Sequence, residues 1–189
     1  IEGGVFKLGA AGGIPSGVGR GNVAVNGTLD LGGYSPTING LSGGGVIDNS
    51  AGVGTYTLTV GANGQGGTFD GVIRNTSGSV ALSKIGTNTL TLTGANTYTG
   101  LTTIGAGVLN VRNGAGLGAT NTGTTVAGGA ALEVQGGIAI GDEALSLNGA
   151  GITNAGALRN ISGDNSHSGP ITLAAAARVN SDAGKLTLG

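Results

Sequence analysis

The sequence predicts an all-β protein that winds as a right-handed parallel β-helix, a solenoid of roughly nine coils. Three observations support this prediction. Leu90 and Leu92 alternate with threonines, which is the period-two pattern of a strand with one apolar face. Short alternating strands follow one another, with glycine and asparagine corners between them. One phrase of the sequence also returns later in the chain, as expected when each unit packs only against its neighbours.

The repeated phrase sets the expected organisation of the chain. The segment 94–100 (GANTYTG) is matched by 163–169 (GDNSHSG), so Tyr98 and His167 occupy the same position of the repeat. The second copy carries extra residues at 174–181. We therefore expect one β-helical repeat domain over residues 1–189, with units at about 80–111 and 156–188, and we expect it to be a segment of a longer polypeptide.

Further strands are expected on both sides of the central unit. Alternation of apolar and polar residues predicts them around residues 23–25, 28–31, 56–60, 69–73, 131–134 and 144–147. A G-x-L-x-[LV] phrase occurs at the strand 28–31 and at the closing strands of both repeats. Its apolar pairs are Leu29/Leu31, Leu109/Val111 and Leu186/Leu188. No segment has helical periodicity with capping residues, so essentially no helix is expected.

An antiparallel β-sandwich is the alternative fold. Asn-Gly dipeptides begin at positions 26, 39, 63, 113 and 148, and Asn-Gly between alternating strands is a strong hairpin signal. The same dipeptide suits the sharp corners of a solenoid, because both residues tolerate left-handed backbone conformations. The unequal strand lengths of the central unit favour the solenoid.

Composition excludes several classes of protein. Charged residues make up 9% of the chain and the net charge is −1, so no basic surface for nucleic acid is expected. No apolar run is long enough to span a bilayer in this segment. Cysteine is absent, which excludes disulfides and thiolate metal sites.

The central unit resembles a known family. The residues GTNTLTLTGANTYTGLTTIGAGVLNV (86–111) are similar to the passenger-associated transport repeat, or autotransporter-associated β-strand repeat, of bacterial autotransporters. The resemblance implies a right-handed parallel β-helix, export to the extracellular space or the bacterial cell surface, and a structural or adhesive role. It implies no particular ligand.

No catalytic residue, cofactor or metal site is expected. His167 is the only histidine, and its equivalence to Tyr98 predicts a structural or surface role. Asp142 and Glu143 are adjacent and would point to opposite sides of a strand, whereas glycoside hydrolysis needs two carboxyl groups facing one bond. Asp164 and Asp182 are expected in corners of the second repeat.

Threonine hydroxyls are the polar groups expected most often on the outer surface. We expect outward rows that include Thr102 and Thr103 and, as possible surface-contact residues, Thr57, Thr59, Thr89, Thr91, Thr93, Thr97 and Thr99. Threonine also suits strands simply because it is β-branched.

Three functions remain open. The first is a non-catalytic stalk or adhesin-type segment of a secreted or surface-displayed passenger, and the second is an extracellular fibre subunit that self-associates through its coil ends. The third is a solenoid that binds or acts on carbohydrate. Host surfaces and glycans are therefore the expected partners, together with copies of the chain itself.

Overall fold

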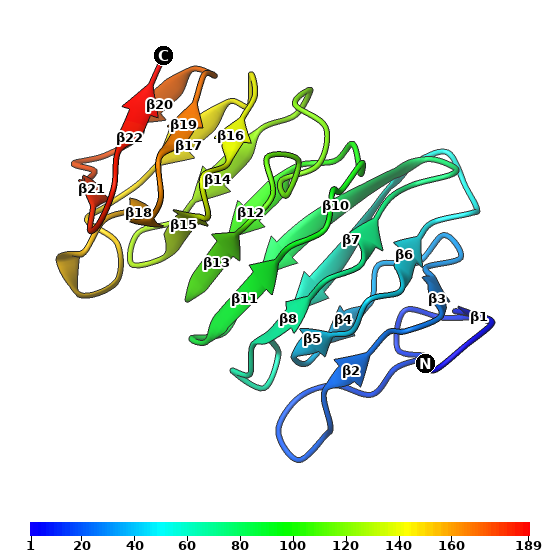
Figure 1. Ribbon diagram of the computed structural model, residues 1–189. Coiled ribbons are helices and arrows are strands. Elements are labelled where there is room, and N and C mark those ends of the chain that lie inside the picture. The colour runs from blue at the N-terminus through cyan, green and yellow to red at the C-terminus, as the bar shows by residue number, and fades with distance from the viewer.

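The computed structural model describes all 189 residues as a parallel β-solenoid, which confirms the predicted fold class. The coils stack from the N-terminus to the C-terminus, as the colour ramp in Figure 1 shows. Every strand pair is parallel, so the antiparallel sandwich is wrong. The chain makes about eight turns, close to the nine expected.

Three faces surround the core. The first face is a seven-stranded sheet whose members run in spatial order β4 (Thr37–Ile38), β7 (Thr55–Val60), β10 (Ser79–Lys84), β12 (Thr102–Ile104), β14 (Thr124–Val126), β17 (Leu145–Leu147) and β20 (Ile171–Leu173). This sheet runs almost the whole length of the solenoid, so a side chain at one register position recurs on seven neighbouring strands.

The second face combines a two-stranded and a six-stranded sheet, which meet where β5 contacts β8. Its strands are β2 (Val23–Ala24), β5 (Leu41–Ser42), β8 (Gly67–Phe69), β11 (Thr89–Leu92), β13 (Val108–Val111), β15 (Ala131–Gln135), β18 (Leu158–Ser162) and β21 (Val179–Ser181).

The third face is interrupted. A four-stranded sheet covers its N-terminal part and a three-stranded sheet its C-terminal part, with strands β1 (Val5–Lys7), β3 (Thr28–Asp30), β6 (Val46–Asp48), β9 (Val72–Ile73), β16 (Ala139–Ile140), β19 (Asn165–His167) and β22 (Leu186–Leu188). Irregular corner segments lie between the two sheets, where Asn96 N–H donates to Ala115 and Thr97 N–H donates to Ile73.

The core consists of columns of aliphatic side chains inside the coils. Leu90 of β11 is in register with Leu109 of β13, and the column continues through Leu132 and Leu158. All four are at most 1% exposed, which confirms the alternation read from the sequence. Burial of such apolar surface, at about 25 cal/mol per Å², is the main favourable contribution to folding.

The Asn-Gly dipeptides form corners and close contacts between coils, and they form no hairpins. A Cβ on Gly40 would lie 2.2 Å from the carbonyl oxygen of Gly66 in the next coil. Glycine is therefore required there because the two backbones approach so closely. The hairpin interpretation fails because the partner of each strand lies a full coil away in sequence.

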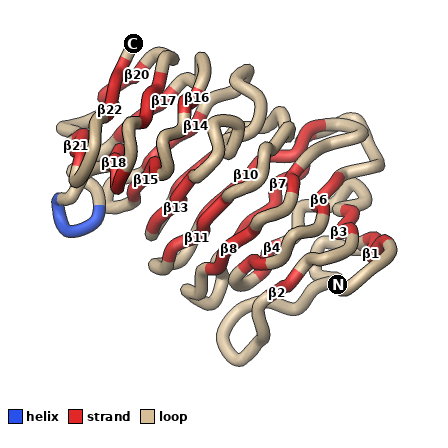
Figure 2. Tube along the Cα trace, in the orientation of Figure 1, coloured by secondary structure: helices blue, strands red, loops and turns tan.

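The one helical element is a 3₁₀ turn, η1 (Ile152–Asn154), shown as the blue segment in Figure 2. Two of its residues, Thr153 and Asn154, have positive φ angles of 50° and 61°. The expectation of essentially no helix is confirmed. Loops such as this one lengthen individual coils, which is why the chain makes fewer turns than an even spacing predicts.

Candidate functional site

A column of hydroxyl side chains runs along the outside of the seven-stranded sheet. Successive Cα partners on its seven strands, called the hydroxyl column below, are Thr37, Thr59, Ser83, Thr103, Thr125, Ser146 and Thr172. The first six are each followed by a buried side chain, so these hydroxyl residues point outward, and Thr172 is in register with them on the last strand. None of the seven is buried. Parallel strands stack at about 4.8 Å, so the column spans about 29 Å.

Three shallow hollows follow one another along this face. The first, about 430 Å³, is lined by Ser35 and Thr37 and by residues of the loop 11–16. The second, about 390 Å³, lies over β7, β10 and β12 and includes Thr57, Ser83 and Thr103. The third, about 140 Å³, lies over β14, β17 and β20. The last two share Leu101 and Thr122, so they adjoin. Six of the seven column residues line one of these hollows, and Thr59 lines none of them.

No charged side chain lines any of the three hollows. Leu101, which is 40% exposed, is the largest apolar side chain between the second and third hollows. Ala81 and Ala144 lie in the hollows on either side of it. This face therefore offers hydroxyl groups and small apolar patches, and it offers no ionic group.

The predicted threonine rows are divided between faces. Thr57 and Thr59 lie on β7 of the seven-stranded sheet, and Thr99 joins this face through a 2.9 Å contact between its hydroxyl and that of Ser79. Thr89, Thr91 and Thr93 lie on or just after β11 of the six-stranded sheet, and Thr97 is exposed in a corner. The seven threonines therefore do not form one array, and their role in contact stays a prediction.

The expectation that Thr102 points outward is wrong. Thr102 is fully buried, whereas its neighbour Thr103 faces solvent. Adjacent residues of a strand point to opposite faces, so only one of the pair can join the outer row. Inside the coil the Thr102 hydroxyl lies 2.6 Å from the Tyr98 hydroxyl.

The buried polar groups continue into the next coils. Thr124, in register with Thr102, donates to Glu143 Oε1 at 2.8 Å. Glu143 is 1% exposed and its Oε2 has no partner, while the neighbouring Asp142 is exposed. Burial raises the pKa of Glu143 and outweighs the lowering effect of the Thr124 hydrogen bond. The two acidic side chains thus point to opposite sides, as expected, and the inner one belongs to the core.

His167 also belongs to the core. It is 2% exposed, and its Nε2 lies 2.7 Å from the carbonyl oxygen of Glu143, to which it donates. Burial lowers the pKa of His167, so the imidazole is held neutral. Tyr98 is likewise fully buried, and burial raises its pKa. Both aromatic side chains at this repeat position therefore fill the interior.

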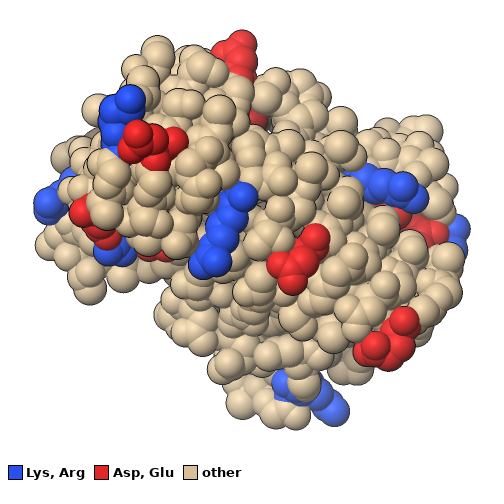
Figure 3. Space-filling view, viewed as in Figure 1, with Lys and Arg blue, Asp and Glu red and all other residues tan.

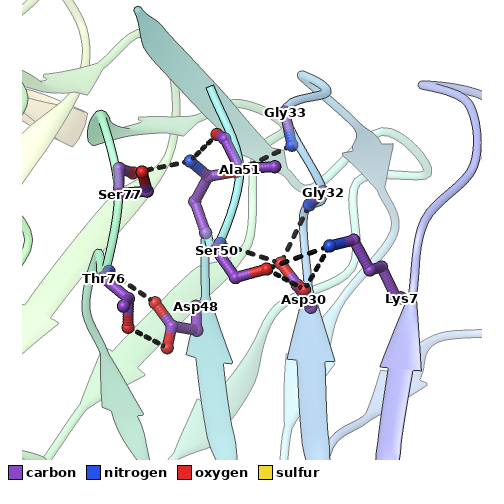
Figure 4. Close-up of polar contacts among 10 residues, drawn as sticks. Lys7, Asp30, Gly32, Gly33, Asp48, Ser50, Ala51, Thr76 and Ser77 are labelled. Atoms are coloured by element: carbon purple, nitrogen blue, oxygen red, sulfur yellow. Dashed lines mark hydrogen bonds and ion pairs between the residues drawn. The ribbon is translucent and has the colours of Figure 1, made fainter. Parts of the chain in front are cut away.

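Asp30 and Asp48 lie in adjacent coils of the third face, in a ladder of acidic and hydroxyl residues (Figure 4). Thr76 donates to Asp48 through its backbone N–H at 2.8 Å and its hydroxyl at 2.7 Å, and Arg74 Nε donates at 2.9 Å. Ser50 binds Asp30 in the same two ways, and Lys7 lies 3.4 Å from Asp30.

These contacts hold both carboxyl groups in the ionised form. Burial alone would raise their pKa values, but the hydrogen bonds from Ser50 and Thr76 outweigh it and hold the pKa of each carboxyl below its usual range. Both aspartates therefore join one coil to the next through these hydrogen bonds.

Three further acidic residues, Glu133, Asp164 and Asp182, are similarly engaged. Arg159 reaches Glu133 at 3.1 Å and also pairs with Asp182, while Asp164 accepts the backbone N–H of Lys185 at 3.0 Å. Asp182 raises the pKa of Arg159. On the face of the molecule drawn in Figure 3, the few charged side chains form small scattered groups. Sequence reading did not foresee these ion pairs, because their members are far apart along the chain.

Lys84 is a buried charged residue whose burial was not predicted from the sequence. It points inward from β10, between Val60 and Ile104, and is fully buried. Its Nζ donates to the carbonyl oxygens of Ile85, Gly86 and Ala106 at 2.7, 2.8 and 3.2 Å. Burial lowers the pKa of Lys84 to about 8. Because it is fully buried and bonded to three carbonyl oxygens, this lysine has a structural role at the corner between two coils.

No helix of the structure has the length and apolar character that crossing a bilayer requires.

The fold and the repeat point to one class of protein. The family model of the passenger-associated transport repeat matches residues 82–111, so the chain carries a repeat of this class. The chain is also 34% identical over 111 residues to the Adhesin BmaC autotransporter of Brucella suis biovar 1 (strain 1330), a match that covers 58% of this chain and 3% of that protein.

These matches confirm the resemblance to autotransporter passengers with such repeats. The matched region is a small part of the relative's own length. No solved structure matches the chain.

Proposed function

We propose that this chain is a non-catalytic segment of a bacterial β-solenoid passenger that is secreted or displayed on the cell surface. In this role it extends the polypeptide away from the cell and presents an adhesive surface. The single observation that carries the proposal is the stack of parallel coils around the matched transport repeat. Similarity to an autotransporter adhesin supports the surface location.

The environment of the titratable side chains supports a structural role. Asp30 and Asp48 each accept several hydrogen bonds from the next coil, and Lys84 donates to carbonyl groups of its own coil and of the next one. Glu143 and His167 lie inside the core and line none of the three hollows. A general acid or base must reach a substrate, and these groups are enclosed instead.

Labelling of intact cells tests the proposal. Antibodies raised against this chain should label unpermeabilised cells that express the parent polypeptide, and external protease should remove the signal. Labelling that appears only after permeabilisation would contradict it. Electron microscopy of the purified chain should show short single rods.

A second candidate is end-to-end self-association. The first coil exposes Val5 (69%) and Phe6 (45%), and the last exposes Leu173 (59%) and Leu188 (44%). Unpaired strand edges with apolar side chains favour pairing with another chain. Sedimentation over a concentration series tests this candidate: growth into long filaments would support it, and a constant monomer mass would contradict it.

A further inference from the structure

The hydroxyl column and its three hollows form a surface with a defined chemistry. Every serine and threonine hydroxyl can both donate and accept a hydrogen bond. The exposed side chains of Leu101 and Ala144 add apolar patches beside them. Because no charged group lines the hollows, an ionic partner would lose its hydration there without gaining a counter-charge. The face therefore favours an uncharged partner that carries many hydroxyl groups.

The geometry further favours a partner with a repeating structure. The same chemistry recurs on seven consecutive strands, at about 4.8 Å intervals over about 29 Å. The hollows follow one another along the sheet order and do not form one deep cavity. An extended polymer lying parallel to the solenoid axis would meet equivalent hydroxyls at every coil, whereas a compact small molecule would use only one hollow.

A folded protein is a poorer fit to this face. Protein interfaces concentrate their affinity in buried tyrosine, tryptophan and arginine side chains. None of these residue types lines the three hollows. A flat face of short hydroxyl side chains provides many weak hydrogen bonds instead, and such bonds add up along a polymer.

We propose that the hydroxyl column is a binding groove for an extended, uncharged polysaccharide. The sugar hydroxyls would exchange hydrogen bonds with the column, and the C–H faces of the sugar rings would pack on Leu101 and Ala144. This inference rests on the proposed function, because the groove meets such polymers only at the cell surface.

Binding of defined hexasaccharides to the purified chain tests the groove. The probes are an uncharged β-1,4-glucan, an uncharged α-1,4-glucan and an anionic galacturonan, each presented at high density on beads. The variant Thr103→Val/Thr125→Val removes two hydroxyls of the column and keeps the β-branched shape. Its matched control is Thr68→Val/Thr89→Val, which removes two exposed hydroxyls from the six-stranded sheet.

We expect an uncharged hexasaccharide to bind, the galacturonan to be excluded, and the column variant to bind about tenfold more weakly. That loss is the size expected from two hydrogen bonds of about 0.5–1.5 kcal/mol each. The control variant should stay within about twofold of the unmodified chain. Unchanged circular dichroism would show that both variants keep the fold.

Three results would overturn the inference. They are no binding of either uncharged probe to the folded chain, equal weakening in both variants, and dimerisation that is lost only in the column variant. The last would assign the face to a second copy of the chain. None of these results affects the labelling of intact cells, so failure of the groove is separate from failure of the surface role.

Discussion

Asn96 is the side chain whose removal should be most informative, because it links three successive coils from inside the corner. Its Oδ1 accepts the backbone N–H of Ile73 at 2.9 Å, and its Nδ2 donates to the carbonyl of Gly116 at 2.7 Å. Asn96 is 2% exposed, so water cannot replace either bond. Asn165 accepts the N–H of Ile138 at the equivalent position of the second repeat.

Replacing Asn96 by Ala should destabilise the solenoid by about 2–6 kcal/mol. The estimate follows from two buried backbone groups left without partners, each costing about 1–3 kcal/mol. Small domains have only about 5–15 kcal/mol of stability in total, so the loss is large. The neighbouring Thr97 is exposed, and Thr97→Ala is the matched control, expected to stay within about 0.5 kcal/mol.

Urea unfolding followed by circular dichroism measures the loss, and hydrogen exchange locates it. The Ile73 amide should lose at least about tenfold of its protection in Asn96→Ala, because each 1.4 kcal/mol corresponds to a factor of ten. Equal stability of the Asn96 and Thr97 variants would refute the reasoning. So would an Ile73 amide that keeps its protection.

Three further predictions concern groups inside or between the coils. Because burial lowers the pKa of Lys84 to about 8, the unmodified chain should gain stability relative to Lys84→Met as the pH rises from about 8 towards 10.5, and a pH-independent difference in Tm would contradict this. Burial raises the pKa of Glu143, so the unmodified chain should lose stability relative to Glu143→Gln as the pH rises from about 4.5 through the raised pKa. Tm curves of the two proteins that stay parallel over this pH range would contradict the prediction. Gly40→Ala brings a Cβ to 2.2 Å from the backbone oxygen of Gly66 and should cost at least about 1–3 kcal/mol in urea unfolding. Gly44→Ala, with open space around it, should cost far less, and equal losses would disprove the close-contact argument.

Much of the fold could be predicted from local pattern. The alternation of Leu90 and Leu92 with threonines correctly identified an inward and an outward face. The internal repeat correctly predicted stacked units, since neither copy can bury its apolar side chains alone. Counting coils was less successful, because corner loops differ in length and alternation says nothing about loops.

The buried polar residues were much harder to predict. The burial of Lys84 and Glu143 was not predicted, because charged residues are rarely fully buried without partners. Their partners are backbone carbonyls and a threonine contributed by other coils, which a sequence pattern cannot place. Thr102 and Thr103 look alike in sequence, and only the register of β12 decides which one faces the core.

The hydroxyl column did leave a signal in the sequence. Six of the seven members come directly before a buried side chain, as in Thr37-Ile38, Thr59-Val60 and Thr103-Ile104. A search for a hydroxyl residue followed by an aliphatic one, once per coil, would have found most of the column. Ser83 breaks that pattern because Lys84 takes the inward position. The hollows themselves depend on Leu101 and on loop positions, and these had no local signal.

The distance between the two ends of the hydroxyl column is the most direct test of the account. The chain has no cysteine, so Thr37→Cys/Thr172→Cys can carry two spin labels at unique positions. Both residues are exposed, and six strand spacings of about 4.8 Å separate them. The solenoid predicts one narrow distribution near 29 Å, broadened only by the label arms. A much shorter distance, or a broad distribution, would contradict the stack of coils on which the proposed functions depend.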